Sequence, residues 1–392
     1  MKLLTAQKEL LEIINEVDLG ISNEDKFWIA LRDSADEDHL EYGDVVVTKT
    51  SEGIQLKCDN FEIVKSGKHT FTVSPPARKC TLPKQSLDIR LVLAVALSKS
   101  SENLLVGTER GSLIRFDTKN KAEIKRIKSA HFSDIIMLRI FPSDKVIASI
   151  GLDFQIKLWD LELGNEQPTR VFKHQKKRIT DVALIGAGRN FVLTSEDGST
   201  VLWECASGNV VSEFLRIDDH EDPALCVTIL STDKKLACSD IVNGELQFEC
   251  EDKVMYVGYR SGVIQEFRIA SHSQTSVKLK RDKDAAVTSL IANEHDLLVA
   301  GYEDGTVVMW DKHAEQPKHE VQFHPSFPIS NMTLAGSETL VFDNGPEGLF
   351  TMNLTTRDVG QLIGLLEAFR VHLIAAVENT VVVATEDEIV QY

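Results

Sequence analysis

The sequence has few cysteines and no apolar run long enough to cross a bilayer. Its six cysteines among 392 residues form no C-x-x-C pair and show no framework spacing, which argues against a disulfide-linked fold. The longest apolar runs, such as 91–97, are strand-sized, whereas a membrane helix needs about 20 apolar residues. The first residues also lack the layout of a signal peptide. We therefore expect reduced thiols, no membrane partner, and a cytoplasmic and nuclear location.

The chain is also short of positive charge. It has 43 lysines and arginines against 60 aspartates and glutamates, which gives a formal net charge of −17. A nucleic-acid-binding protein must supply cations that replace the counterions of the phosphates, so this balance argues against a nucleic-acid partner. It favours protein partners with basic surfaces. The hydrophobic share of 43% is ordinary for a globular protein that buries a large core.

Enzyme motifs are missing as well. The sequence contains no G-x-S-x-G, no P-loop and no H-E-x-x-H. The glycines of GAGRN (186–190) lie between two strand-like runs, whereas a dinucleotide-binding loop needs a following helix. His313, His319 and His324 have neither a cysteine nor a regular helix beside them, so we expect no metal site. We predict a protein that is not an enzyme and that has no cofactor.

An internal repeat organises most of the chain. Segments such as SIGLDFQIKLWD and AGYEDGTVVMWD combine a short apolar strand, a polar turn and a second strand that ends on an aromatic residue. One residue marks each copy: Phe116, Trp159, Trp203, Phe267, Trp310 and, in two degenerate copies, Asn353 and Tyr392. The steps between these residues are 43, 44, 64, 43, 43 and 39. A period of about 40–45 with a W-D ending is typical of a WD40 blade, so we predict an all-β, seven-bladed WD40 β-propeller.

Two departures from the period have simple interpretations. The 64-residue step contains about 20 extra residues between Leu230 and Val254, which we interpret as an enlarged loop in the fourth blade. The last copy offers only three strands, and an open ring would expose a bare sheet edge. We therefore expect a strand from upstream to complete this blade, and the run TFTV at 70–73 is the candidate.

The first 66 residues do not follow the repeat. Apolar residues between Leu3 and Val17 recur at helical spacing and predict one amphipathic helix of about four turns. Strand-like runs follow at 27–31, 44–49, 53–58 and 61–65. We predict a small α+β N-terminal domain over 1–66 and a propeller over 67–392.

Three aspartates occur at one position of the repeat. Asp153, Asp197 and Asp304 each stand six residues before the tryptophan of their blade, in the turn between the second and third strands. In WD blades this aspartate is tied by buried hydrogen bonds to a histidine, a serine or threonine, and the tryptophan, so we interpret it as structural rather than catalytic. The members of this structural tetrad are His131, Ser149, Asp153 and Trp159 in blade two, His174, Asp197 and Trp203 with Thr194 in blade three, and Asp304 and Trp310 in blade five.

The remaining candidates are charged residues that the repeat places on one face of the disc. Turns between the second and third strands carry acidic residues: Glu109, Glu196, Glu303, Glu386 and Asp387. The loop that enters blade three adds a basic island: Lys176, Lys177 and Arg178. Single surface charges are usually only solvated, but charges repeated on one face produce a field that attracts a complementary protein. We predict that this top face binds a protein partner.

Two segments go beyond the general pattern. The stretches FPSDKVIASIGLDFQIKLW (141–159) and HQKKRITDVALIGAGRNFVLTSEDGSTVLWECASG (174–208) closely resemble the proteasomal ATPase-associated factor family of WD-repeat chaperones. The resemblance implies a non-catalytic chaperone for assembly of the proteasome's regulatory particle base. It implies binding to the C-terminal small domain of a proteasomal ATPase subunit through the top face, by a protein that is a monomer on its own.

Two other functions are weaker predictions. Substrate receptors of cullin-type ubiquitin ligases resemble one another in carrying W-D-x-R, but here the equivalents are Trp159-Asp160-Leu161-Glu162 and Trp310-Asp311-Lys312-His313, without the arginine. An enzyme that uses the central channel would need carboxylates or metal ligands on the first strands. These strands (91–97, 135–140, 179–184 and 287–292) are almost wholly apolar.

Overall fold

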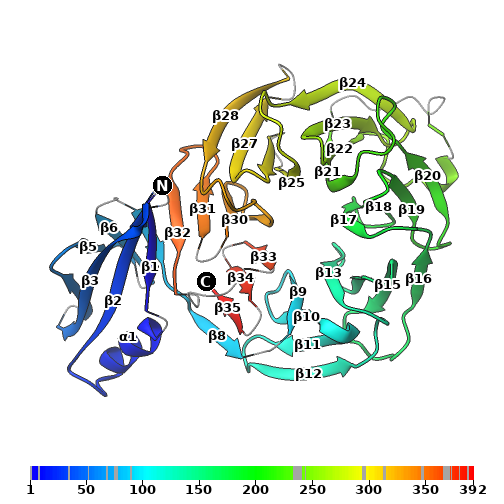
Figure 1. Ribbon diagram of the computed structural model, residues 1–392. Helices are drawn as coiled ribbons and strands as arrows, with labels where there is room; N and C mark the ends of the chain where they lie inside the picture. The colour runs from blue at the N-terminus through cyan, green and yellow to red at the C-terminus, as the bar shows by residue number, and fades with distance from the viewer. Residues whose placement is uncertain are drawn as a thin grey trace.

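The computed structural model gives the arrangement of most of the chain. It describes residues 2–392 apart from 8, 34, 35, 52, 68, 75–77, 89, 90, 233–240, 243, 294–296, 312–314, 346, 347, 365–370, 372, 379, 386 and 387. Four-stranded sheets stand around a central axis and form a ring, and a smaller N-terminal unit lies outside this ring (Figure 1).

Each sheet of the ring is one blade. Blade one contains β9 (Val92–Leu97), β10 (Asn103–Thr108), β11 (Leu113–Asp117) and β12 (Ala122–Ile127). Blade two contains β13 (Ile135–Ile140), β14 (Val146–Gly151), β15 (Gln155–Asp160) and β16 (Arg170–Lys173). Blade three contains β17 (Ile179–Ile185), β18 (Asn190–Ser195), β19 (Thr200–Glu204) and β20 (Val210–Phe214). Blade four contains β21 (Ala224–Ser231), β22 (Lys253–Tyr259), β23 (Val263–Arg268) and β24 (Ser273–Lys280).

The remaining blades complete the ring. Blade five contains β25 (Val287–Ala292), β26 (Leu298–Tyr302), β27 (Thr306–Asp311) and β28 (Gln316–Gln322). Blade six contains β29 (Met332–Ala335), β30 (Thr339–Asp343), β31 (Leu349–Asn353) and β32 (Val359–Leu362). Blade seven contains β33 (Leu373–Val377), β34 (Thr380–Ala384), β35 (Glu388–Gln391) and β8 (Gln85–Asp88). Among the described residues, six of these blades are separate four-stranded sheets, and blade six is the first four strands of a seven-stranded sheet.

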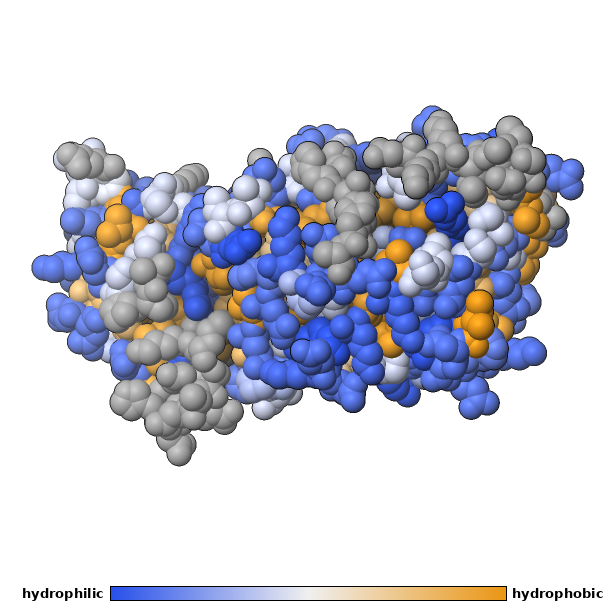
Figure 2. Space-filling model, turned by 90° about the horizontal axis from the view of Figure 1, so that it is seen from above, coloured by the Kyte–Doolittle hydropathy of each residue, from blue (hydrophilic) through white to orange (hydrophobic). Residues whose placement is uncertain are grey.

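Burial explains the strand composition. All six residues of β18 are buried, because inner strands of a blade are covered on both faces by the neighbouring blades. The edge strands β24 and β28 instead mix exposed and half-buried residues. Hydrophilic residues cover most of the rim that Figure 2 shows from above, with hydrophobic residues visible between them. Polar edges of this kind protect a sheet from pairing with another molecule.

The aromatic that marks each copy packs between blades. Trp159 of blade two is 2% exposed and lies in one apolar cluster with Leu105 and Leu113 of blade one. Trp310 of blade five is 1% exposed and shares a cluster with Tyr256 of blade four. The repeat spacing therefore reflects a large buried side chain at most interfaces between blades, whereas Asn353, the marker of blade six, is half-buried.

The ring closes through a different strand from the one that the sequence predicts. The upstream strand that pairs with β35 is β8, with Ser86 opposite Val390. The predicted strand at 70–73 is wrong for this role, because β6 (Thr70–Ser74) pairs with β5 (Glu62–Lys65) and β7 (Arg78–Thr81). Phe71 and Val73 are buried in the core of the N-terminal unit, so the apolar side chains of this strand pack there and not in blade seven.

The N-terminal unit is larger than the predicted 1–66. Its core includes Phe71, Cys80 and Leu82, so the boundary at 66/67 is wrong and the unit extends through residue 82. One sheet has the order β1-β2-β3-β4, with β1 (Lys2–Ala6), β2 (Glu24–Asp33), β3 (Asp36–Thr50) and β4 (Gly53–Cys58). A parallel pair between β7 and β32 makes β5, β6 and β7 continuous with blade six.

The N-terminal helix is shorter than the periodicity predicts. Helix α1 covers Leu10–Leu19, whereas residues 2–6 form β1. Two contacts explain this difference. Leu4 pairs with Leu31 of β2, and the side chain of Gln361 accepts the Leu4 N–H at 3.3 Å and donates to the Leu4 carbonyl at 2.7 Å. Tertiary pairing therefore outweighs the local helical pattern.

The enlarged loop of blade four lies where the sequence predicts it, between β21 and β22. Its described residues 241, 242 and 244–252 fold back onto blade three. Asn190 donates from Nδ2 to the Leu246 carbonyl at 2.9 Å, and Glu249 accepts the Ala187 N–H at 2.7 Å. A Cβ on Gly186 would lie 2.2 Å from the Glu249 carboxylate. The glycines of the GAGRN turn thus permit close packing of this loop rather than nucleotide binding.

Candidate protein-binding face

Turns and loops from successive blades meet on one face of the ring. The N–H groups of Glu109, Glu196 and Glu303 each donate at 3.0 Å to the carbonyl of a residue in the loop that enters the same blade. These carbonyls belong to Leu91, Arg178 and Ala286. The turn between the second and third strands therefore lies against the entry loop in three blades. We call the surface formed by these turns and entry loops the top face.

The predicted surface residues lie on the top face with different exposure. Glu109 and Glu303 are exposed, whereas Glu196 is half-buried. Lys176, Lys177 and Arg178 are all exposed in the entry loop of blade three, which we call the basic segment. Glu386 and Asp387 lie outside the described residues. The structure thus brings Glu196 and the basic segment together and places Glu109 and Glu303 on other blades.

The tetrad of blade two is fully formed. His131 Nδ1 lies 2.9 Å from Asp153 Oδ1, and His131 Nε2 lies 2.8 Å from Ser149 Oγ. Trp159 Nε1 donates to the same Ser149 oxygen at 2.8 Å. The order Asp–His–Ser is that of a hydrolase triad. However, Ser149 and the His131 side chain are both 0% exposed, and the indole already occupies the serine oxygen. The arrangement therefore acts as a structural bridge between strands.

Several groups stabilise the charge of Asp153. Burial by itself would raise the pKa of this carboxyl. The hydrogen bond and charge of His131 and the N–H groups of Phe132 and Gln155 outweigh burial, so the pKa lies below its ordinary value. The ionised carboxylate therefore stabilises the fold at neutral pH.

The predicted tetrad of blade three is not formed. Leu193, and not Thr194, is in register with Ser149, since Leu193 pairs with Val201 as Ser149 pairs with Lys157. A shift of one residue turns a side chain to the other face of a sheet. Thr194 accordingly accepts a hydrogen bond from Thr180 at 2.8 Å. His174 is exposed, and Trp203 Nε1 is buried without a hydrogen-bond partner among the described residues.

Asp197 has a local role instead. Its Oδ1 accepts the Ser199 N–H at 3.0 Å and the Ser199 hydroxyl at 2.6 Å. The predicted bond from this carboxylate to His174 is therefore wrong, and Asp197 stabilises its own turn.

An arginine replaces the histidine in blade five. Both oxygens of Asp304 accept hydrogen bonds from Arg281 at 3.2 Å, and the Arg281 guanidinium lies 4.5 Å from the centre of the Tyr302 ring. Burial alone would raise the pKa of Asp304, but Arg281 and Thr306 hold it below the ordinary value. A paired and stacked guanidinium therefore anchors the entry loop of blade five.

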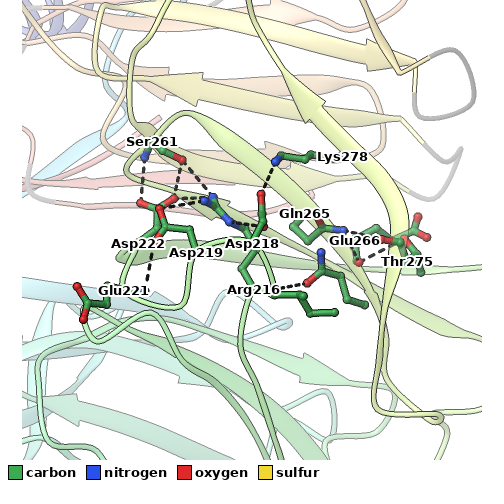
Figure 3. Close-up of polar contacts among 12 residues, drawn as sticks. Arg216, Asp218, Asp219, Glu221, Asp222, Ser261, Gln265, Glu266, Thr275 and Lys278 are labelled. Carbon is green, nitrogen blue, oxygen red and sulfur yellow. Dashed lines mark hydrogen bonds and ion pairs between the residues drawn. The ribbon is translucent and has the colours of Figure 1, made fainter.

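The entry loop of blade four has a similar anchor, which sequence reasoning missed (Figure 3). Arg216 has a side chain only 5% exposed, and its guanidinium contacts Asp222 at 2.6 Å, Asp218 at 2.9 Å and Asp219 at 3.3 Å. The Ser261 hydroxyl donates to Asp222 at 2.5 Å, and Lys278 pairs with Asp218. The signal in the sequence is the run DDHED at 218–222, which we call the acidic loop.

This anchor fixes exposed carboxylates on the top face. Asp219 and Glu221 are exposed in the acidic loop, and Asp282 and Asp284 are exposed in the entry loop of blade five. With Glu303, these residues form what we call the acidic pole, in which carboxylates outnumber the exposed cations Arg260 and Lys283. The basic segment and Lys173 make the top of blade three basic. The described part of the top face thus has two poles of opposite charge, while Glu386 and Asp387 of the predicted acidic ring lie outside the described residues.

The central channel holds one ion pair that the apolar pattern of the first strands did not predict. The channel cavity has a volume of about 590 Å³ and is lined by the first strands of the blades. Arg139 contacts Asp181 at 3.1 Å, and the carboxylate also accepts the N–H groups of Val182 at 2.8 Å and Val227 at 3.1 Å. Burial raises the pKa of Asp181 despite these partners. The pair connects blades two, three and four.

Searches of the described residues add two findings. They contain no group of three or more histidine, cysteine, aspartate or glutamate residues placed to hold a metal ion. His313 lies outside them. None of the described helices combines the length and the apolar character that a bilayer span requires.

Comparisons with known proteins agree with this geometry. The model of the family "WD domain, G-beta repeat" matches residues 274–311. The chain is 28% identical over 332 residues to the 26S proteasome regulatory subunit RPN14 of Saccharomyces cerevisiae, which covers 81% of this chain and 78% of that protein.

Other similarities are shorter. The chain is 28% identical over 127 residues to Pre-mRNA-processing factor 17 of Homo sapiens, 30% of this chain and 22% of that protein. It is 28% identical over 117 residues to the DDB1- and CUL4-associated factor 11 homolog of Caenorhabditis elegans, 29% of this chain and 20% of that protein. The structure and the comparisons together show an all-β WD40 β-propeller with modest similarity to a yeast proteasome regulatory subunit.

Proposed function

We propose that this protein is a non-catalytic assembly chaperone of the proteasome's regulatory particle base. It binds the C-terminal small domain of an ATPase subunit and acts as a monomer in the cytoplasm and nucleus. The observation that carries the proposal is the similarity over 81% of the chain to a yeast proteasome regulatory subunit. The resemblance of 141–159 and 174–208 to a family of assembly chaperones supports it.

The top face supports this function as a binding surface. The ion pairs of Arg216 and Arg281 hold its acidic loops in place, so binding a partner costs little ordering entropy. Charged and polar residues form much of its surface, beside a few exposed apolar side chains such as Phe132, and a partly polar interface suits a complex that must separate when assembly is complete. A partner with basic residues opposite blades four and five would bind in one orientation.

Purification of the tagged protein from cell extract tests the proposal. We expect at least one ATPase subunit of the regulatory particle base to be recovered and identified by mass spectrometry. Each purified small domain is then titrated against the protein by calorimetry. Recovery without any proteasomal ATPase subunit, together with no binding of any small domain, would contradict the proposal.

Charge reversal tests the acidic pole. The triple variant Glu221→Lys, Asp282→Lys and Glu303→Lys is expected to weaken binding of the small domain by about tenfold or more, because complementary charges are lost. A control with the same change in charge reverses three exposed residues on the opposite face: Glu166, Glu315 and Glu338. Equal affinity of the two triple variants for the small domain would show that the acidic pole is not part of the interface.

A substrate receptor of a cullin-type ubiquitin ligase is the second candidate. The similarity to a DDB1- and CUL4-associated factor favours it but covers only 29% of this chain. Where W-D-x-R receptors carry arginine, this chain has Glu162 after Trp159, and Glu162 pairs with Arg115 of blade one. Recovery of a cullin adaptor in place of ATPase subunits in the same purification would favour this function.

A further inference from the structure

Phe132 is a nearly free aromatic side chain on the top face. It is 91% exposed, in the entry loop of blade two, directly after the buried tetrad histidine. Its N–H donates to Asp153 Oδ2 at 3.3 Å, and the ammonium of Lys157 lies 5.4 Å from the ring centre. The backbone is therefore fixed while the ring faces solvent. Rigid exposed aromatics of this kind carry much of the affinity of protein interfaces.

Phe154 is the second unusual aromatic: it is 38% exposed, and Asp153, the residue before it, accepts the Phe132 N–H. It stands five residues before Trp159, a position at which four other blades have glycine: Gly111, Gly198, Gly262 and Gly305. All four glycines have positive φ, between 71° and 89°, and Phe154 adopts the same region with φ 60°. This region is strained for a residue with a side chain, and strain of this type is concentrated at functional positions.

The four glycines also permit a close contact that Phe154 prevents. A Cβ on Gly111 would lie 2.2 Å from the His131 carbonyl oxygen, and a Cβ on Gly305 would lie 2.1 Å from that of His324. The equivalent distance is 2.6 Å for both Gly198 and Gly262. Because Phe154 has a Cβ, the entry loop of blade three cannot approach its turn in this way. His174 and the basic segment are accordingly exposed, whereas His131 is 2% exposed.

The charge around the two phenylalanines is positive in a chain whose net charge is −17. Arg110 is exposed in the neighbouring turn of blade one and donates its N–H to Asp134 in the loop of Phe132. On the other side, Lys173 and the basic segment are exposed. An apolar anchor between cations favours a ligand in which apolar side chains are flanked by carboxylates.

We propose that Phe132 and Phe154, which we call the aromatic pair, bind an acidic segment with large apolar side chains on the partner's small domain. The identity of this partner rests on the proposed function. The apolar side chains pack against the two rings, and flanking carboxylates face the basic segment. Together with the acidic pole, this contact fixes the orientation of the partner. The acidic pole repels the partner's acidic segment, and the basic segment repels the partner's basic residues.

The first test measures binding of the small domain to point variants by calorimetry. Phe132→Ala is expected to weaken binding at least tenfold, and Phe154→Gly at least fivefold, while the urea midpoint of Phe154→Gly stays equal to or above that of the wild type. Ile21→Ala is the matched control, since Ile21 is also 72% exposed but lies in the N-terminal unit, away from the top face. It is expected to change binding by less than twofold. Equal binding by wild type and Phe132→Ala would overturn the proposal.

The second test does not depend on the ATPase subunits. Two labelled 12-residue peptides carry two leucines each, flanked in one by glutamates and in the other by lysines. Fluorescence anisotropy is expected to show at least tenfold tighter binding of the glutamate peptide to the wild type, and loss of this binding in Phe132→Ala. If no small domain binds the wild type, the proposed function fails and this test alone decides the aromatic pair.

Two outcomes of the second test would overturn the proposal. One is equal binding of both peptides, or no binding of either, to the wild type. The other is a wild-type dimer in sedimentation velocity that Phe132→Ala converts to a monomer, because the pair would then belong to a contact between copies of this chain.

Discussion

Blades two and three carry the same histidine, aspartate and tryptophan at nearly the same spacing, but only blade two forms the buried tetrad. Its hydroxyl is Ser149, whereas the residue in register in blade three is Leu193. His131 is buried and hydrogen-bonded at both ring nitrogens, whereas His174 is exposed. The comparison teaches that residue types in the right order are not sufficient. Strand register and the position of the entry loop decide whether a polar network closes.

Blade three has replaced polar contacts with aromatic packing. Trp203 contacts Phe172 edge-on, with ring centres 5.2 Å apart, and stacks on Phe191 at 6.4 Å. Such contacts stabilise a core without hydrogen bonds. They leave the Trp203 N–H without a partner among the described residues. The tryptophan of blade two is therefore held by a network of hydrogen bonds, whereas the tryptophan of blade three is held by aromatic packing.

Removal of the histidine should give the largest difference between the two blades. His131→Ala is expected to lower the free energy of unfolding by about 3 kcal/mol, because Asp153 and Ser149 lose a buried partner. His174→Ala is expected to lower it by only about 0.5 kcal/mol, since the exposed side chain loses just an edge contact with Trp203, with ring centres 6.0 Å apart. Urea unfolding followed by tryptophan fluorescence measures both. Equal losses in the two variants would contradict the comparison.

A smaller difference is expected for the two tryptophans. Trp159→Phe and Trp203→Phe remove similar apolar area, but only Trp159 donates to a hydroxyl. We expect Trp159→Phe to cost about 1 kcal/mol more than Trp203→Phe, the value of one buried hydrogen bond. Urea unfolding followed by circular dichroism is the measurement. A larger loss of stability in Trp203→Phe than in Trp159→Phe would contradict the assignment of the hydrogen-bond network to blade two.

The tetrad of blade two should also give a pH dependence in the acid range. The pKa of Asp153 in the folded protein is below its ordinary value of 3.8, so its stabilisation is complete above that value and is lost as the pH falls through the folded pKa. Asp153→Asn should therefore be less stable than the wild type at pH 7, and the difference in stability between the two proteins should decrease toward pH 2. Urea midpoints measured from pH 7 to pH 2 would show this change. A difference in urea midpoint that does not change with pH would show that the substitution acts through packing and not through the charge of Asp153.

The repeat spacing predicted the blades because most interfaces between blades bury one large side chain at the same place, with Asn353 of blade six as the exception. It could not predict the closing strand. The run at 70–73 has a clear strand pattern, but QSLD at 85–88 has a single apolar residue, and β8 joins the ring through backbone pairing with β35. Similarly, the helical pattern of residues 3–17 could not reveal that Gln361 holds Leu4 in a strand.

The site was predicted less completely than the fold. The repeat placed Glu109, Glu303 and the basic segment on one face. The backbone hydrogen bonds between the turns and the entry loops agree with this placement. It did not identify Arg216 and Arg281, because these arginines replace the histidine of the pattern. It also missed Phe154, although a phenylalanine at a position of glycine in the other blades was a visible signal.

Hydrogen–deuterium exchange of the protein with its bound ATPase small domain tests the central claim, that the top face is the binding surface. The account predicts slower exchange in the entry loops 128–134, 174–178 and 215–223, with unchanged exchange in the turns 142–145 and 186–189 on the opposite face. Protection confined to those opposite turns, or to the N-terminal unit, would contradict it.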